Sequence, residues 1–235
     1  MRATRWLALP ALALVLSACS TSSQGNIGDA TPAEDNAISA AAPSEILAQA
    51  KKNAMAQSSF HIKGVGQCPD SSFTVDMKLR SDEFGVGTVR LGSDSLELVT
   101  TPDGVYVRAP KAFWAAQKSG AVATTIGDHW VKFAKASNPC LTALGSFSTV
   151  IANYLGYTET PTKQVGGAVF TVPAVQLQFS ASASVWVASR GVPLPVEVDD
   201  TSISTQISLG EWGAVVAVTA PLPTDVIEAS TLPSK

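Results

Sequence analysis

The chain has 235 residues, of which 16 are Lys or Arg and 19 are Asp or Glu, so its formal net charge is −3. The acidic balance, and the lack of a basic tract with interleaved aromatic residues, exclude a nucleic-acid-binding protein, because such binding depends on neutralising phosphates. Length and a hydrophobic content of 46% suit one globular domain.

The first residues have the organisation of a secretory signal. A basic start at residues 1–5 precedes an almost wholly apolar stretch at 6–16, and the tetrapeptide Leu-Ser-Ala-Cys ends at Cys19. This end resembles the lipobox of bacterial lipoproteins, which implies that Cys19 receives a diacylglyceryl group and, after cleavage, carries fatty-acyl chains such as palmitate. The alternatives are an ordinary cleavage that leaves a free thiol and a membrane-spanning helix. A span needs roughly 20 apolar residues, and this shorter stretch contains Pro10.

We interpret residues 1–18 as a signal peptide, 19–42 as a flexible tether and 43–235 as one folded domain. The segment after Cys19 is rich in Ser, Ala and Gly and has no aromatic residue. Such a composition cannot bury enough surface to offset its ordering entropy. The expected location is the outer, extracytoplasmic face of the cell membrane, with the lipid anchor as the membrane contact.

A helix is predicted from Pro43 to about Ser58, with Ser44 as its cap. Its apolar face is expected to hold Ile46, Leu47, Ala50, Ala54 and Met55. Period-two alternation follows, and it predicts a strand whose dry face carries Phe73, Val75, Met77 and Leu79. Other strands are predicted around 60–62, 85–91, 95–100 and 104–108, joined by turns rich in Gly and Asp.

Two helical pieces are predicted in the middle of the chain, at 110–118 and 141–155, with a strand at 129–133 between them. The second piece is apolar over most of its surface, so it must be buried or cover something. The remaining strands are predicted at 168–172, 174–179, 184–188, 195–199, 203–209 and 215–219.

About ten or eleven strands in one run of hairpins predict a single large antiparallel sheet that is curved by its twist. One face of that sheet is dry and must be covered, and the helices are the only available cover. The predicted fold class is therefore α+β.

Two cysteines, Cys68 and Cys140, remain after Cys19. In an oxidising compartment such a pair more often forms a disulfide than stays free, although two buried thiols are the alternative. No metal site is predicted, because the two histidines, His61 and His129, lie far apart and the cysteines lack the paired spacing of zinc ligands.

The order of several segments is similar to that in actinobacterial lipoproteins of the LppX/LprG kind. The segments are Ile46–Lys51, Phe60–Gly64, Leu96–Val107, Phe113–Trp114, Gly127–Lys132, Pro195–Val198 and Leu209–Gly213. The resemblance covers about residues 43–228. It implies a LolA-like fold, an incomplete antiparallel β-barrel with helices packed on its concave side. In several members of the family, an apolar cavity between sheet and helices holds the acyl chains of lipids or glycolipids.

No catalytic constellation is predicted. The chain lacks a Gly-x-Ser-x-Gly elbow, and Asp128 is badly placed to orient His129, because neighbours on a strand point to opposite faces. His61 is expected on the polar face of its strand. We interpret the protein as non-enzymatic and without a cofactor.

A cavity between sheet and helices is predicted to bind a lipid, a glycolipid or another amphipathic ligand, held by burial at about 25 cal/mol per Å² with few directed contacts. The candidate lining residues are Phe73, Val75, Met77, Leu79, Leu144, Phe147, Val150 and Ile151. The alternative is an interaction or structural module with a filled core that docks an envelope protein partner. A large void favours the first reading, and a packed interior with an exposed apolar patch favours the second.

Overall fold

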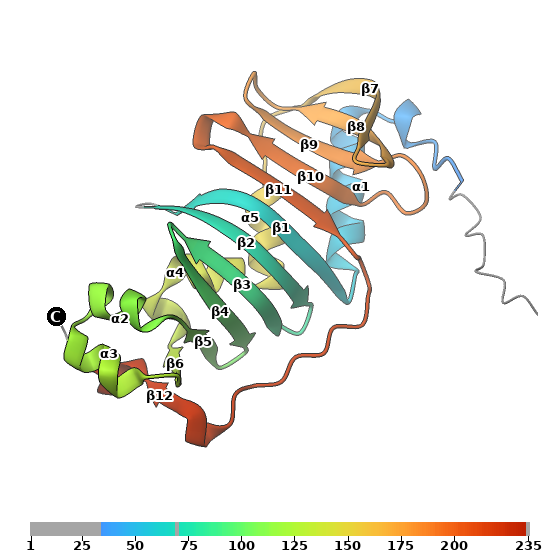
Figure 1. Cartoon of the computed structure of the whole chain (residues 1–235). Coiled ribbons are helices and arrows are strands. Elements are labelled where there is room, and N and C mark those ends of the chain that lie inside the picture. Colours follow the sequence, from blue (N-terminus) through green and yellow to red (C-terminus); the bar gives the residue numbers. More distant parts are fainter. Residues whose placement is uncertain (1–33, 69–70, 234–235) are drawn as a thin grey trace, which may run out of the picture. The chain divides into compact units, whose positions relative to one another are not determined.

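The computed structural model describes residues 34–68 and 71–233. In this part of the chain, twelve strands form one curved, unclosed sheet, and five α-helices accompany it (Figure 1). The strands are β1 (Ser59–Cys68), β2 (Ser71–Arg80), β3 (Gly85–Leu91), β4 (Asp94–Thr101), β5 (Gly104–Arg108), β6 (Trp130–Phe133), β7 (Thr162–Val169), β8 (Val172–Gln178), β9 (Ala183–Ala188), β10 (Pro195–Asp200), β11 (Thr205–Gly210) and β12 (Val226–Glu228). The helices are α1 (Pro43–Met55), α2 (Lys111–Gln117), α3 (Gly120–Ile126), α4 (Pro139–Leu144) and α5 (Phe147–Tyr154).

The strand order is β12-β6-β5-β4-β3-β2-β1-β11-β10-β9-β8-β7. From β1 the chain builds outward to β6, crosses one face of the sheet through α4 and α5, and returns inward from the opposite edge until β11 pairs with β1. The expected single run of hairpins is therefore wrong, since two runs meet in the middle of the sheet. Neighbouring strands are antiparallel, except that β12 pairs in parallel with β6.

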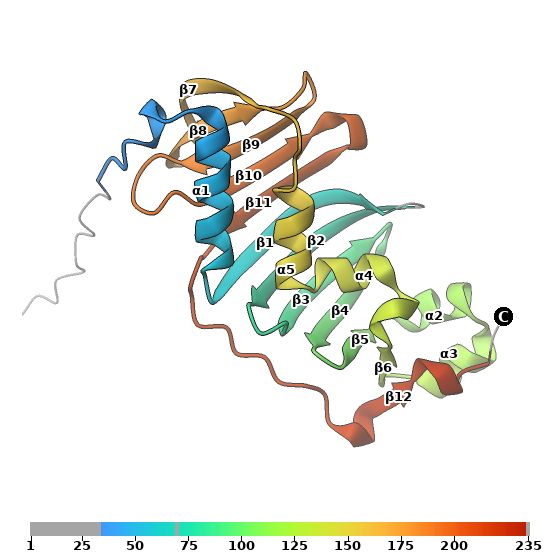
Figure 2. The same ribbon diagram turned by 180° about the vertical axis from the view of Figure 1, so that it is seen from behind.

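Helices α1, α4 and α5 lie against the same face of the sheet, here called the inner face (Figure 2). The alternation in β2 places Phe73, Val75, Met77 and Leu79 on this face, and all four are buried as predicted. Helix α1 contributes Ile46, Ala50 and Ala54 to the core, whereas Met55 is exposed, contrary to expectation.

Helix α1 begins one residue before the predicted cap. Pro43 occupies the first turn, where its missing N–H costs nothing, and the Ala42 N–H donates to Glu45 Oε2 at 3.3 Å. Ser44 therefore lies inside the helix instead of capping it.

The helix predicted at 141–155 is broken into α4 and α5 by Gly145 and Ser146. Ser146 caps α5, because its Oγ accepts the Thr149 N–H at 3.2 Å. The Thr100 hydroxyl donates to the Gly145 carbonyl at 2.8 Å, and a Cβ at position 145 would collide with the Thr100 side chain. Strand β4 thus lies too close to position 145 for any residue other than glycine, and the chain turns at this point.

The strand predicted at 215–219 is absent from the described residues. Strand β11 already has β1 and β10 as neighbours, so the segment after it cannot pair beside β11 and leaves this part of the sheet. Val215 is fully exposed, and the chain next pairs at β12. Helix α3 and strand β12 are additions that the sequence patterns did not predict.

Residues 34–42, which the sequence analysis assigns to the tether, contact the folded domain. Ile38 in the short 3-10 helix η1 (Ile38–Ala40) is buried in the core, and Lys163 Nζ donates to the Ser39 and Ala41 carbonyls at 2.7 and 2.8 Å. Residues 1–33, including the predicted signal peptide and Cys19, lie outside the described residues. No helix within the described part is long and apolar enough to cross a membrane.

Candidate ligand-binding site

The eight predicted lining residues come together in one core between the sheet and the helices. Four lie on β2, Leu144 lies on α4, and Phe147, Val150 and Ile151 lie on α5. Each is at most 4% exposed. The Phe147 ring packs against Phe60 of β1 with ring centroids 5.0 Å apart. Side chains therefore occupy most of the space under α5.

A small cavity remains at the end of this core. Its volume is about 120 Å³, and three of the predicted residues, Phe73, Leu144 and Val150, line it together with Tyr154. Burial raises the pKa of the Tyr154 hydroxyl to about 12, so this group is a neutral phenol. Ligand pockets usually measure roughly 300 to 1,000 Å³, so this cavity alone is too small for a lipid.

A larger groove of about 540 Å³ opens next to the small cavity, between α2, α4 and the adjoining strand ends. Leu91, Phe113 and Leu141 supply apolar wall, and Gln117 and Asn138 supply polar groups. Its volume lies within the usual range for a ligand pocket. None of the eight predicted residues lines this groove.

Cys68 and Cys140 form a disulfide with a Cα–Cα distance of 6.0 Å, in agreement with the favoured reading of the sequence. Both cysteines line the small cavity and the groove, so the bridge is a wall shared by the two spaces. It ties the start of α4 to the end of β1.

Local hydrogen bonds hold α4 at the groove. Asn138 Oδ1 accepts the Leu141 N–H at 3.2 Å, which caps the helix, and Pro139 fits its first turn. The Thr142 hydroxyl donates to the Lys135 carbonyl at 2.8 Å. On the other wall, Phe113 packs edge-on against the buried Trp114. The groove is therefore built from capped, packed helix ends.

The opposite, outer face of the sheet carries an ionic cluster centred on His61. Its two ring nitrogens lie 2.7 Å from Asp76 Oδ1 and 2.9 Å from Glu211 Oε1. Lys63 Nζ lies 3.3 Å from Asp76, and Lys78 Nζ lies 2.6 Å from Glu211. His61 thus lies on the polar face of β1, as expected, but its two acidic neighbours were not predicted.

These neighbours change the acidity of the two carboxyl groups. Burial alone would raise the pKa of Asp76, but hydrogen bonds from His61 and Lys63 outweigh it and lower that pKa. Hydrogen bonds from Lys78 and His61 likewise lower the pKa of Glu211. Both groups are held as carboxylates, a result that suits an ion-pair network.

The Asp128-His129 pair does not form the start of a triad. His129 Nδ1 lies 2.9 Å from the Ile126 carbonyl, and Asp128 lies beside Arg108 and Glu97 at another surface depression. The ring of His129 therefore contacts the backbone of the turn after α3 and not a catalytic partner.

Among solved structures, the described fold is similar to that of LprF from Mycobacterium bovis. The TM-score is 0.54 at 17% identity, and the match covers 76% of this chain and 96% of that one. A second match is an uncharacterized conserved protein from Thermus thermophilus, with a TM-score of 0.38 at 11% identity, covering 79% of this chain and 98% of that one. No protein-family profile matches the chain, and no curated protein matches it significantly.

The likeness to LprF confirms the predicted fold, an open curved sheet with helices on its concave face. It supports the resemblance to LppX/LprG-type lipoproteins. At this identity it establishes the fold alone.

Sequence reasoning missed the groove because its walls come from four separate segments. Cys68 ends β1, Leu91 ends β3, Phe113 belongs to α2, and Leu141 belongs to α4. The one available signal was the cysteine pair, since Cys68 and Cys140 mark the point where those segments meet.

Proposed function

We propose that the protein is a non-catalytic lipoprotein, anchored through Cys19 on the outer face of the cell membrane, that binds the apolar part of a lipid or glycolipid. The ligand would enter the groove between α2 and α4. The observation that carries the proposal is this apolar groove of about 540 Å³ on a LolA-like fold.

The groove suits an amphipathic ligand because apolar and polar walls meet in it. Leu91, Phe113 and Leu141 would pack against methylene groups, while Gln117 and Asn138 would face a polar headgroup. The small cavity beyond the disulfide offers about 120 Å³ more if α4 shifts. Phe73, Leu144 and Val150 would then contact the end of an acyl chain of the ligand. Three of the predicted residues would thus belong to the proposed site.

A chain lacking residues 1–19 tests the ligand directly. Native mass spectrometry should detect a co-purifying mass of lipid size, and a fluorescent fatty acid should compete with it. Leu91→Trp would fill the groove and should lower uptake at least tenfold. Thr88→Trp is the matched control, because Thr88 lies on the same strand but is exposed on the outer face. Equal uptake by the two variants would place the ligand elsewhere.

A second candidate is an interaction module with a filled core. It is favoured by the near-complete burial of the eight residues under α5. Absence of any bound lipid, together with full stability of the chain lacking residues 1–19, would support this candidate over the first.

The anchor has its own test. Cys19→Ser should abolish labelling by a radioactive fatty acid and make any remaining membrane attachment reversible on dilution, because two or three acyl chains provide the stable attachment that one cannot. Labelling of the Cys19→Ser chain, or a membrane attachment that stays irreversible without label, would contradict the lipobox interpretation.

A further inference from the structure

A second groove, of about 480 Å³, opens on the outer face of the sheet, where β7 to β11 lie. Its walls include Phe170 and Val172 of the β7–β8 hairpin and Val192 of the β9–β10 loop. These three side chains are 81%, 38% and 55% exposed, respectively. Large apolar side chains rarely gather on a surface that stays in water, so this patch indicates a binding partner.

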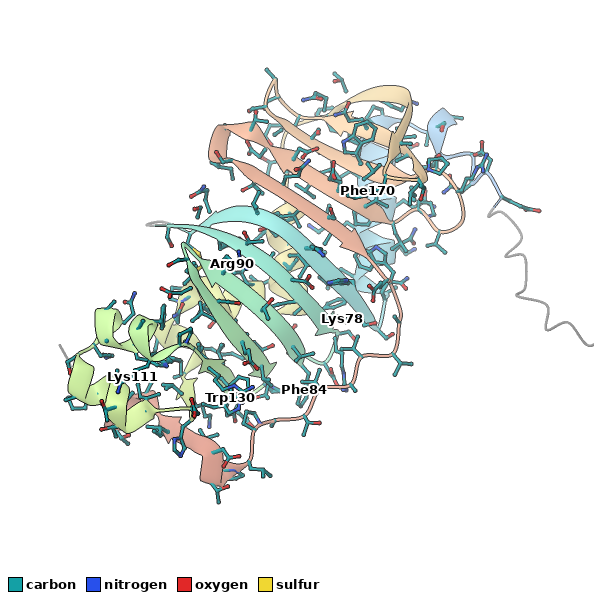
Figure 3. The ribbon with its side chains drawn as sticks, in the orientation of Figure 1. Lys78, Phe84, Arg90, Lys111, Trp130 and Phe170 are labelled. Atoms are coloured by element: carbon teal, nitrogen blue, oxygen red, sulfur yellow. A yellow bond between two sulfur atoms is a disulfide. The ribbon has the colours of Figure 1, made fainter. Side chains whose placement is uncertain are left out.

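Phe170, Val172 and Val192 lie on one side of the groove, and His61, Lys63 and Glu211 of the ionic cluster line it as well. Figure 3 shows Phe170 over the β7–β11 part, away from Lys78 and Arg90, which lie over β1 to β4. The latter part carries the ionic cluster of His61 and its neighbours. A partner that covers the whole groove must therefore offer apolar groups to Phe170 and polar groups to the ionic cluster, as the acyl chains and headgroups of a bilayer do.

The chain enters the folded domain directly beside the patch. The Gly191 N–H donates to the Glu34 carbonyl at 2.9 Å, and the Asn36 N–H donates to the Ser189 carbonyl at 3.1 Å. The side chain of Asn36 also donates to the Ala188 and Gly191 carbonyls. Residues 34–36 are thus held against the loop that carries Val192.

The length of chain between Cys19 and this point limits its distance from the membrane. About 15 residues can span at most roughly 50 Å, even when fully extended. A twelve-stranded sheet is itself roughly 50 Å wide at about 4.8 Å per strand. An anchor at Cys19 therefore restrains the β7–β10 end much more closely than the β6–β12 end.

We infer that the patch formed by Phe170, Val172 and Val192 docks onto the lipid bilayer that holds the anchor, with these side chains among the acyl chains. The inference rests on the proposed lipidation of Cys19. It assigns the outer groove to the membrane and leaves the groove between α2 and α4 free for a ligand.

The experiment uses the full chain, produced in a host that acylates lipoproteins and reconstituted into vesicles of phosphatidylcholine with a minor fraction of phosphatidylglycerol. Phe170→Trp is compared with Phe84→Trp, an aromatic position at the turn before β3 (Figure 3). The added tryptophan emission is measured with and without brominated acyl chains. We expect several-fold quenching for Phe170→Trp and none for Phe84→Trp.

The outcomes separate this inference from the proposed function. If intact mass shows an acylated chain and the emission of Phe170→Trp is not quenched, membrane docking is overturned while the anchor stands. A chain without an acyl group overturns both the anchor and the docking. Ligand uptake in the other groove is measured separately and decides neither.

A second measurement uses the unacylated Cys19→Ser chain and flotation with the same vesicles. Phe170→Ser combined with Val192→Ser should weaken vesicle binding about a hundredfold, because each buried apolar side chain contributes roughly tenfold. Ile203→Ser, which removes another exposed apolar side chain, is the control and should leave binding unchanged. Equal loss in both variants would contradict a specific patch.

Discussion

The inner and outer faces of the same strands differ in how they are covered. On β2, the inward residues Phe73 and Val75 are buried beneath helices, while the outward Asp76 and Lys78 form ion pairs in contact with water. Within the described residues, the inner face opens into a groove beside the disulfide, and the outer face carries a partly apolar groove over β7 to β11 and β1. The fold therefore sets which face is dry, and the individual side chains set where space remains.

The closed and open parts of the inner face have different helix cover. Helix α5 presents Phe147, Val150 and Ile151 to the sheet, and Phe60 fills the space opposite. Helix α4 is shorter and is interrupted after Leu144, so it leaves a gap toward α2. A curved sheet of this kind can therefore be filled on one half of its inner face and open on the other.

Removal of the disulfide should have the largest effect on stability. The bridge links β1 to α4 beside the groove of the inner face, where few other contacts hold the helix to the sheet. The cysteines are 72 positions apart, and the loop-entropy relation gives a loss of about 4 kcal/mol for Cys68→Ser combined with Cys140→Ser. Urea unfolding of the oxidised chain and the variant measures this loss. Thiol titration of the denatured, unreduced chain lacking residues 1–19 should find no free thiol, and two free thiols would contradict the prediction.

Overpacking the inner face should have the next largest effect. Val75→Trp places a large ring in a filled core, so we expect a loss of about 1 to 3 kcal/mol. The neighbouring Thr74 is exposed on the outer face, and Thr74→Trp should change stability by no more than about 0.5 kcal/mol. Thermal unfolding compares them. Equal stability of the two variants would show that the space under α5 is a cavity.

The strands β2 to β5 could be predicted from the sequence because their signals are local. Alternating residues in β2 and the turns after Gly92 and Pro102 specify neighbouring hairpins without information from elsewhere. The dry face, and with it the four buried residues of β2, follows from the same alternation.

Features that depend on distant partners could not be predicted. The pairing of β1 with β11 joins residues about 150 positions apart, as in the His61–Glu211 contact. The break at Gly145 depends on Thr100, and the absence of a strand at 215–219 depends on the occupied edges of β11. Helical and strand periodicity carry no information on such contacts.

The outer face should show a stability change at mild pH that the inner face lacks. Burial and the neighbouring Asp199 raise the pKa of Glu197 on β10 to about 7. The folded state then binds more protons than the unfolded state between about pH 4.5 and 7, so stability falls as the pH rises through this range. Glu197→Gln should remove that fall and raise stability at pH 8 by about 1 kcal/mol, discounted for solvent exposure.

Melting temperatures of the unsubstituted chain and Glu197→Gln, measured from pH 4 to 8, test this prediction. The two curves should separate only above about pH 5. Ser208, the partner of Glu197 across β11, offers a matched position, and Ser208→Ala should leave the pH profile unchanged. Parallel curves for Glu197→Gln and the unsubstituted chain would contradict the assignment.

The ionic cluster on the outer face should have the smallest effect. The pKa of Asp76 lies below its usual value, so the folded state favours the carboxylate. Its contribution is present above the unfolded pKa, near 3.8, and is lost as the pH falls through the folded pKa. Because Asp76 is nearly half exposed, Asp76→Asn should cost only about 0.5 kcal/mol at pH 7, and less in high salt. The difference between the two chains should vanish at strongly acidic pH. A loss as large as that of Val75→Trp would mean that the outer face contributes to stability as much as the buried one.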